Sequence, residues 1–407
     1  MRIAFVSQEY PPETAKGGIG TQTFLKAHGL AALGHQIHVI SRSANGKFSE
    51  RNDHGVQVTR IPGLESRMPI FTEAADWLSY SAEVAAAVAA LHAKSPLDVV
   101  DFPEWGAEGC VHLLNRTEWN RIPTVIHLHG PLVMFAHTMG WPELDSEFFR
   151  AGTAMEGACV RLADAVFSSS KCSADWCAKH YGRQRDEIRV LHTGVDTELF
   201  SPRAVRKAER PTIVFAGKLA RNKGVHLLAE AACKLAPEFP GLHLRLLGRG
   251  DQKIIGELQA ITRELPDLLD LPGFVDRAEL RDHLSRAHIF AAPSQYEGGP
   301  GFVYLEAMAC GLPVIACAGS GAAEVVHPGE NGLLVPPRDV DQLVSSLRSL
   351  LGDTAARERM GKQAREYVLA EADSRVCIRR LEAYYSSVTS RPAPYGKAAA
   401  QPDSSRA

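Results

Sequence analysis

Two glutamates, Glu297 and Glu306, stand at the ends of the stretch EGGPGFVYLE, with the eight residues GGPGFVYL between them. The stretch follows the strand-like run IFAAPS and leads into the helix-like run VYLEAMAC. Backbone amides of a glycine turn, together with the N-terminus of a helix, can bind a phosphate. Pro300 has no N–H group, so its role is to fix the path of the loop. The stretch predicts an anion site flanked by two carboxylates.

A ligand that is anionic only at its centre explains this combination. In a nucleotide sugar the diphosphate lies between a sugar and a ribose, and both ends carry hydroxyl groups that can donate to a carboxylate. An ordinary glycine-rich turn with a glutamate in the following helix explains the same residues. This stretch alone does not decide between the two interpretations.

A cluster of cations follows another strand-like run. Lys218, Arg221 and Lys223 lie in GKLARNKG, directly after TIVFA. Cations at the carboxyl end of a strand can neutralise a leaving diphosphate, although most such clusters are solvated basic loops. Gly248, in the turn LLGRGD after another apolar strand, is a weaker indication of the same kind.

The first half of the chain adds a second glycine turn and two histidines. Gly17 and Gly18 lie between the first strand-like run and a helix for which Thr21 is a plausible N-cap, and their spacing differs from the dinucleotide-binding G-x-G-x-x-G. In TVIHLHG we expect His127 and His129 to point to opposite faces of a strand, with His129 facing a cleft and His127 structural. No third ligand with suitable spacing accompanies them, so we predict no metal site.

The composition is that of a globular protein with more than one core. The chain has 407 residues, 45% of them hydrophobic, and a formal charge of −2, so it lacks the basic field of a nucleic-acid-binding protein. Its eight cysteines show no paired spacing, which indicates a reducing compartment. We find no signal-peptide pattern and no run of about 18 apolar residues. We therefore expect a cytoplasmic protein.

Short β-rich runs alternate with longer helical patterns in two successive series. The first series runs from RIAFVS to AVFSSS, and the second from TIVFAGKL to PVIAC. Such alternation predicts parallel sheets with helices on both faces. We predict an α/β fold of two doubly wound, Rossmann-like domains that face each other across a cleft, because such sheets bind ligands beyond the carboxyl ends of their strands.

The domain boundaries follow from a proline- and charge-rich segment near residues 195–210. We predict a first domain over residues 1–200 and a second over 201–372. A helix within residues 373–390 is expected to pack back on the first domain. The remaining residues, 391–407, lack the apolar content to pack, and we expect a disordered tail.

Taken together, these motifs resemble the retaining glycosyltransferases of family four (glycosyl transferases group 1), which have the GT-B architecture. The similarity spans nearly the whole chain, from GGIG through VIHLHG, GKLARNKG and LPGFV to PSQYEGGPGFVYLEAMACGLPV and ENGLLVPP. It implies an enzyme that moves a sugar from a UDP- or GDP-sugar to a hydroxyl acceptor with retention of anomeric configuration, in polysaccharide, glycolipid or glycoconjugate biosynthesis.

The resemblance also implies roles for individual residues. Glu297 would contact hydroxyls of the donor sugar, Glu306 would contact the ribose, and His129 would contact the transferred sugar near the reaction centre. Lys218 and Lys223 would hold the diphosphate, with no metal or other cofactor, and with His129 and Glu297 they form the implied catalytic group. The other implied donor-binding residues are Gly17, Gly18, Arg221, Gly248, Phe274, Val275, Gly299, Gly301, Phe302 and Val303.

The sequence departs from the family pattern at two places. The family usually has seven residues between the two glutamates and this chain has eight, which leaves open the amides that meet the phosphate. The family also usually has arginine at the position of Lys218, and lysine loses the bidentate geometry.

Several readings of the chemistry stay open at this point. We favour a reaction in which the leaving phosphate acts as the base, over a double displacement that needs a carboxylate nucleophile beside the anomeric carbon. A nucleotide-sugar 2-epimerase or hydrolase would convert the donor without a second sugar, and a non-catalytic nucleotide-sugar binder would show no turnover.

The acceptor is the least specified partner. We expect a variable loop at residues 130–152 to bind it, because Phe135 and Trp141 suit stacking on a sugar or an apolar carrier, although ordinary packing explains them equally. A glycan, a lipid-linked glycan and a small molecule are all compatible. A lipid-linked acceptor would bring the protein to the membrane surface.

Overall fold

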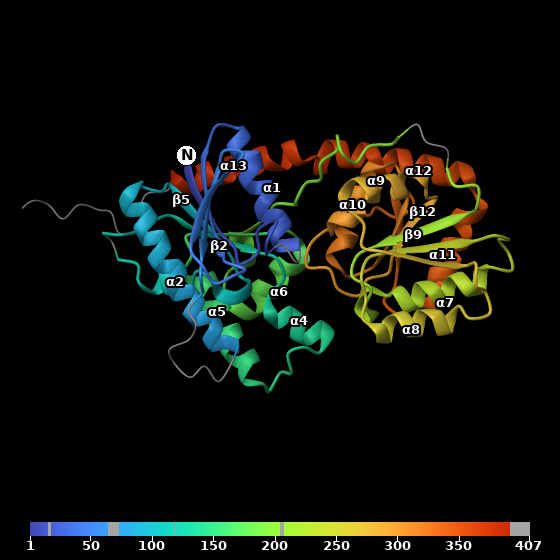
Figure 1. The fold of residues 1–407 in the computed structure, drawn as a ribbon, viewed down its shortest axis with the longest axis horizontal. Coiled ribbons are helices and arrows are strands. Elements are labelled where there is room, and N and C mark those ends of the chain that lie inside the picture. The colour runs from blue at the N-terminus through green and yellow to red at the C-terminus, as the bar shows by residue number, and fades with distance from the viewer. Residues whose placement is uncertain (15–17, 64–72, 118, 204–206, 391–407) are drawn as a thin grey trace, which may run out of the picture.

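The computed structural model describes residues 1–14, 18–63, 73–117, 119–203 and 207–390. Figure 1 shows them as two lobes side by side, one formed by the first half of the chain and one by the second. Gly17 and the tail at 391–407 lie outside the described residues.

The first lobe is built on an eight-stranded sheet with the order β3-β4-β2-β1-β5-β6-β7-β8. Neighbouring strands pair in parallel, except for the edge pair β3 and β4, which is antiparallel. The strands are β1 (Arg2–Val6), β2 (Gln36–Arg42), β3 (Ser49–Asp53), β4 (Val56–Ile61), β5 (Val99–Pro103), β6 (Thr124–Leu128), β7 (Ala165–Ser168) and β8 (Ile188–Val190).

Helices cover both faces of this sheet and make two separate cores. One core joins the sheet to α2, α3, α5 and α6, and the other joins it to α1 and α13. The helices of the lobe are α1 (Gly18–Ala32), α2 (Glu73–Lys94), η1 (Trp105–Ala107), α3 (Cys110–Leu114), α4 (Leu132–Met139), α5 (Glu147–Leu162), α6 (Lys171–Tyr181) and η2 (Arg185–Glu187). Ser146 and Ser170 cap α5 and α6 by accepting a backbone N–H bond, as short polar side chains do at helix starts.

The second lobe has a six-stranded parallel sheet with the order β11-β10-β9-β12-β13-β14. Its strands are β9 (Thr212–Ala216), β10 (His243–Leu247), β11 (Leu269–Gly273), β12 (Ile289–Ala292), β13 (Val314–Cys317) and β14 (Gly332–Val335). Its helices are η3 (Arg221–Lys223), α7 (Val225–Leu235), α8 (Gln252–Ile261), α9 (Arg277–Arg286), α10 (Phe302–Ala309), η4 (Gly321–Glu324), α11 (Val340–Gly352), α12 (Thr354–Tyr367) and η5 (Val368–Ala372).

The strand order of each sheet reverses direction at one point. In the second sheet the chain moves outward from β9 to β11, returns to β12 on the other side of β9, and then moves outward to β14. In the first sheet the corresponding point lies between β1 and β5. Loops that leave such a switch point diverge to opposite faces and open a crevice at the carboxyl ends of the strands. The loops after β9 and β12 carry Lys218 and Glu297 to this crevice.

The last helix, α13 (Ser374–Thr389), returns to the first lobe. Figure 1 shows it in red along one edge of the molecule, running from the second lobe to the first. Ile378, Leu381 and Tyr385 are buried against α1 and the first sheet. The hydroxyl of Tyr385 donates to Asp101, which also forms an ion pair of 2.9 Å with Lys26 inside the core.

The α/β class and the two facing sheets predicted from the sequence are confirmed, and three details differ. The expected runs did not include the β3–β4 hairpin, β8 or β14, which are short or lie at sheet edges. Thr21 lies inside α1 instead of capping it. The expected loop at 130–152 contains α4 and the start of α5.

The buried ion pair yields a stability prediction. The side chains of Lys26 and Asp101 are only 7% and 2% exposed, so removing one charge leaves the other buried without its counterion. Lys26→Met should therefore lower the free energy of unfolding by about 3–5 kcal/mol, measured by urea denaturation. The solvated pair Lys362–Glu366 provides the control, since Lys362→Met should cost less than about 1 kcal/mol. Equal effects of the two substitutions would contradict the prediction.

Candidate active site

Two adjoining cavities lie where the carboxyl ends of the two sheets face each other. The first has a volume of about 1130 Å³ and is lined mainly by the loops after β9, β10 and β11 and by the start of α10. The second, of about 600 Å³, is lined by both lobes. Gly18, Lys218, Phe302 and Val303 line both cavities, so the two form one continuous cleft. An extended ligand can occupy both.

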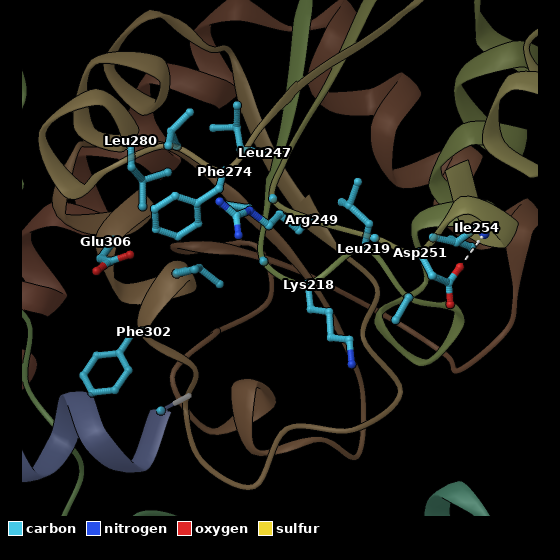
Figure 2. Close-up of a pocket in the computed structure, with 18 of the residues that line it drawn as sticks. Lys218, Leu219, Leu247, Arg249, Asp251, Ile254, Phe274, Leu280, Phe302 and Glu306 are labelled. Atoms are coloured by element: carbon cyan, nitrogen blue, oxygen red, sulfur yellow. Dashed lines mark hydrogen bonds between the residues drawn. The ribbon is translucent and has the colours of Figure 1, made fainter. Parts of the chain in front are cut away.

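The first cavity has an apolar end suited to a planar ring. Phe274 is 69% exposed, and the guanidinium of Arg249 lies 5.5 Å from the centre of its ring. Leu247, Val275 and Leu280 line the same region, and Figure 2 shows Phe274 and Arg249 side by side with Leu280 and Leu247 above them in the view. Exposed aromatic and guanidinium planes beside aliphatic side chains can stack on a nucleobase.

Glu306 lies deep in the wall of the first cavity. It is 3% exposed, and its one ion pair among the described residues is with Arg277, 3.1 Å away. Burial raises the pKa of Glu306 to about 7, and Arg277 opposes that rise. A carboxylate in this position can accept two hydroxyl hydrogen bonds once it is ionised.

Backbone amides point into the cleft where the two cavities meet. Gly301 has a φ of 74°, which glycine adopts without strain, and it is the residue before α10. The amides of Phe302 and Val303, in the first turn of α10, have no acceptor among the described residues. Such unpaired amides and the helix dipole favour an anion. Gly299 lies against Ser169 of the first lobe.

Gly248 lines the first cavity, but its geometry indicates a packing role. A Cβ atom there would lie 1.8 Å from the carbonyl oxygen of Gly217, and the φ of Gly248 is 143°. The loops after β9 and β10 therefore approach each other as closely as backbones can, and this approach forms the floor that carries Lys218 and Arg249.

The three predicted cations occupy different places. Lys223 donates to Glu297 over 2.7 Å in the second cavity. Lys218 is exposed at the junction and forms no ion pair with any described carboxylate. Arg221 lines the first cavity and is paired with Glu257. Of these three cations, Lys218 lines both cavities, whereas Lys223 lines the second and Arg221 the first.

His129 lines the second cavity and His127 does not, but the expectation that the two side chains point to opposite faces of the strand was wrong. Residues two apart in a strand share a face, and the centres of the two rings are 3.9 Å apart. Burial lowers the pKa of both imidazoles well below their usual value, so both rings are neutral near pH 7. Glu104 holds the strand end in place, because its carboxylate accepts the amides of His129 and Gly130 at 2.6 and 2.5 Å.

The two lobes touch directly beside the second cavity. The carbonyl oxygen of Gly298 accepts the hydroxyls of Ser170 and Ser173, each at 2.6 Å. Tyr296 packs its ring 4.4 Å from that of Phe135. The loop that carries Glu297 is thus fixed by the first lobe as well as by its own.

Of the two aromatic residues predicted to bind the acceptor, only Phe135 lines the second cavity. Trp141 is 49% exposed, lies 5.8 Å from the ring of Phe148, and lines neither cavity. The sequence analysis also missed Arg249, Arg277 and Gln22, which line the cleft. Arg249 follows a strand-like run in LLGRGD and could have been found by that rule, whereas Arg277 and Gln22 lie on helix faces that the sequence alone does not orient.

Two other kinds of site are absent from the described parts of the chain. No group of three or more His, Cys, Asp or Glu side chains is placed to hold a metal ion. None of the described helices is long and apolar enough to cross a membrane. All eight cysteines are free.

Comparison with known proteins identifies the family. A family model described as Glycosyl transferases group 1 matches residues 196–367, and one described as Glycosyltransferase Family 4 matches residues 16–199. A glycogen synthase of Mycobacterium tuberculosis is 30% identical over 387 residues, which cover 92% of this chain and 91% of the relative. The chain belongs to the glycosyl transferases group 1 family. It is a glycosyltransferase.

Solved structures of other proteins share the fold of this chain. A sucrose-phosphate synthase from Thermosynechococcus elongatus superposes with a TM-score of 0.79 at 24% identity, covering 95% of this chain and 98% of that one. The Anabaena HepE protein in complex with UDP and glucose gives a TM-score of 0.72 at 20% identity, covering 95% and 100%. The two-lobed GT-B arrangement of this glycosyltransferase is therefore a recurrent one.

Because Gly298 lies against the other lobe, we predict that one added methyl group at this residue impairs sugar transfer. In Gly298→Ala the Cβ would lie 2.1 Å from the carbonyl oxygen of His129, so the two lobes of the glycosyltransferase must separate. Since a displacement of about 1 Å can cost about 100-fold in rate, sugar transfer should fall steeply. Nucleotide affinity, measured by calorimetry, should change little because the first cavity belongs mainly to the second lobe. Gly256→Ala, with open space around it in α8, is the control. Unchanged transfer in Gly298→Ala would contradict this reading.

Proposed function

We propose that this glycosyltransferase binds a nucleotide-diphosphate sugar across both cavities and transfers the sugar to a hydroxyl acceptor with retention of anomeric configuration. The observation that carries the proposal is the order of groups along the cleft. Phe274 and the buried Glu306 lie at one end, Lys218 and the free amides of α10 lie in the middle, and the Glu297–Lys223 pair lies at the other. This order matches base, ribose, diphosphate and sugar.

Each part of the donor has a partner of suitable chemistry. The base would stack near Phe274 and Val275, and the ribose hydroxyls would donate to Glu306. The diphosphate would lie between Lys218 and the amides of Phe302 and Val303. The transferred sugar would occupy the second cavity, where Glu297 can accept its hydroxyls. The HepE structure holds UDP and glucose, which agrees with this class of donor.

The proposed reaction needs charge stabilisation at the diphosphate. The bond between the anomeric carbon and the phosphate oxygen breaks, and Lys218, Lys223 and the α10 amides stabilise the leaving charge. The acceptor oxygen forms its bond to the anomeric carbon on the same face, and its proton passes to the leaving phosphate oxygen. Glu297 is held by Lys223 and acts on the sugar hydroxyls. A double displacement ranks second, because it needs a carboxylate nucleophile beside the anomeric carbon and we assign Glu297 to the sugar hydroxyls.

The lobes and their contacts suit transfer over hydrolysis. The Gly298 carbonyl, the two serine hydroxyls and the Tyr296–Phe135 contact close the cleft beside the sugar position. Excluding water from a reactive donor protects it until an acceptor hydroxyl arrives. The relatives include transferases to different acceptors, among them a glycogen synthase and a D-inositol 3-phosphate glycosyltransferase. We propose a sugar or a sugar-like polyol as the acceptor class.

A donor screen tests the proposal and its independence of metal ions. Purified protein should release nucleotide slowly from one of the UDP-, GDP- or ADP-sugars. EDTA should leave the rate unchanged, because Lys218 and Lys223 would offset the negative charge of the diphosphate in place of a metal ion. Loss of activity in EDTA with recovery on adding a divalent ion would refute the metal-free mechanism. Absence of both binding and release with all donors would refute the proposed donor class.

The raised pKa of Glu306 predicts a pH dependence of donor binding. With a pKa of about 7, Glu306 ionises between about pH 6 and 8, and only the carboxylate accepts both ribose hydroxyls. Affinity for an intact nucleotide sugar, measured by calorimetry, should rise over this range. Hydrogen bonds to a charged group contribute about 1.5–3 kcal/mol, so Glu306→Gln should bind about 10- to 100-fold more weakly at pH 8.

The same substitution supplies the control for the pH profile. Glu306→Gln should bind equally at pH 6 and pH 8 if this carboxyl causes the change. The folded-state pKa lies above the usual value of 4.5, so ionisation of Glu306 lowers the stability of the fold as the pH rises from about 4.5 to 7. Glutamine removes that loss, which separates weaker binding from poorer folding. A variant that keeps the wild-type pH profile would assign the dependence to another group.

A further inference from the structure

A series of hydrogen bonds between buried side chains, here called the polar chain, runs from the C-terminal helix toward the second cavity. Tyr385 of α13 donates to Asp101, and Lys26 of α1 bridges Asp101 at 2.9 Å and the Nδ1 atom of His127 at 3.0 Å. All four side chains are buried. Neither the transfer chemistry nor the packing of α13 requires a lysine and an aspartate at these core positions, so the chain calls for a separate explanation.

The chemistry of its members gives the chain a fixed direction. An ammonium group has only donors, so Nδ1 of His127 must accept, and the neutral ring carries its proton on Nε2. That proton is donated to the hydroxyl of Ser169 at 2.8 Å. Ser169 in turn donates to the side-chain oxygen of Gln22 at 3.3 Å. The amide oxygen of Gln22 is thereby engaged, which leaves its NH2 group as the end of the chain.

Gln22 lines the second cavity together with His129 and Glu297. Its NH2 group has no acceptor among the described residues. Gly18 lies one helical turn earlier on the same face of α1 and lines both cavities, whereas Gln22 does not line the first. The NH2 group therefore belongs to the sugar side of the cleft and not to the diphosphate junction.

We propose that Gln22 contacts the transferred sugar by donating a hydrogen bond from its NH2 group to a hydroxyl oxygen of the sugar. We further propose that Tyr385, Asp101, Lys26, His127 and Ser169 are positioning residues that hold the amide in this orientation. The inference rests on the proposed function, since it places a sugar in the second cavity. It adds a contact from the first lobe to the contact that Glu297 makes from the second.

Substitutions at Gln22 test the contact itself. A neutral hydrogen bond contributes about 0.5–1.5 kcal/mol, so Gln22→Leu should lower kcat/KM for the sugar donor about 3- to 10-fold. Its affinity for the free nucleoside diphosphate should match that of the wild type, because that ligand does not reach Gln22. Gln342→Leu, on the exposed face of α11, is the matched control and should leave both values unchanged.

Donors with single deoxy positions identify the contacted oxygen. If Gln22 donates to one hydroxyl oxygen, the donor that lacks this hydroxyl should be turned over equally by the wild type and by Gln22→Leu. The other deoxy donors should keep the full difference. A loss that is the same for every deoxy donor would show that Gln22 acts on packing and would overturn the proposed contact.

A double-substitution cycle tests the positioning chain. Ser169→Ala alone frees the amide of Gln22 to rotate and should lower kcat/KM by a similar factor. In the Gln22→Leu background, Ser169→Ala should have no further effect, because residues of one network are not additive. Additive losses would overturn the positioning role of Ser169.

The outcomes also separate this inference from the proposed function. If the wild type turns over no nucleotide sugar, the proposed function fails and the Gln22 contact fails with it. If the wild type is active and Gln22→Leu keeps wild-type kcat/KM with every donor, only the Gln22 inference fails.

Discussion

The cleft depends on the crossing between the lobes, where the segment that leaves the first lobe lies beside the segment that returns to it. The segment that leaves the first lobe and the segment that returns to it pair like strands at Val195 and Asp373. The amide of Val195 donates to Ala372 at 2.8 Å, and the amide of Ser374 donates back to Val195 at 2.9 Å. Gly194 has no room for a side chain, since a Cβ there would lie 2.5 Å from Cα of Ser374. Both connections therefore share one edge, which fixes the side on which the cleft can open.

The crossing is also held by charge. Burial acts to raise the pKa of Asp373, but hydrogen bonds from Arg375 and Thr197 outweigh it and lower the pKa to about 2. The aspartate also caps α13. The start of the returning helix and the connection out of the first lobe are thus fixed by the same side chain. The position of Tyr385, three turns along α13, follows from this anchor.

The loop between the two glutamates makes a direct contact between the lobes. Gly298 presents its carbonyl to two serines of the first lobe, and its Cα faces the backbone of His129. Gly301 then starts α10 with a positive φ, which leaves the amides of Phe302 and Val303 at the junction of the cavities. The loop therefore contacts the other lobe, and the start of α10 lies at the junction of the cavities.

How far the sequence predicts this molecule depends on whether a feature is local. Strands, glycine turns and strand-end cations leave a signal within a few residues, so the two sheets, Lys218, Lys223 and Glu297 could be placed from the chain alone. Arg277 and Gln22 reach the cleft only through the packing of helices against sheets, and nothing local marks them. The wrong expectation for His127 had a different source, since the two-residue period of a strand already places it beside His129.

The two glutamates answer the electrostatic problem of an anion site in different ways. Glu297 is paired with Lys223, so its carboxylate repels a diphosphate less than an unpaired one would, while its second oxygen can still accept from a hydroxyl. Glu306 is removed from water, and this burial raises its pKa to about 7. Ionising it is favourable only when donors replace the lost water, and ribose hydroxyls are such donors. Both carboxylates can thus lie beside a diphosphate because each repels it less than a solvated, unpaired carboxylate would.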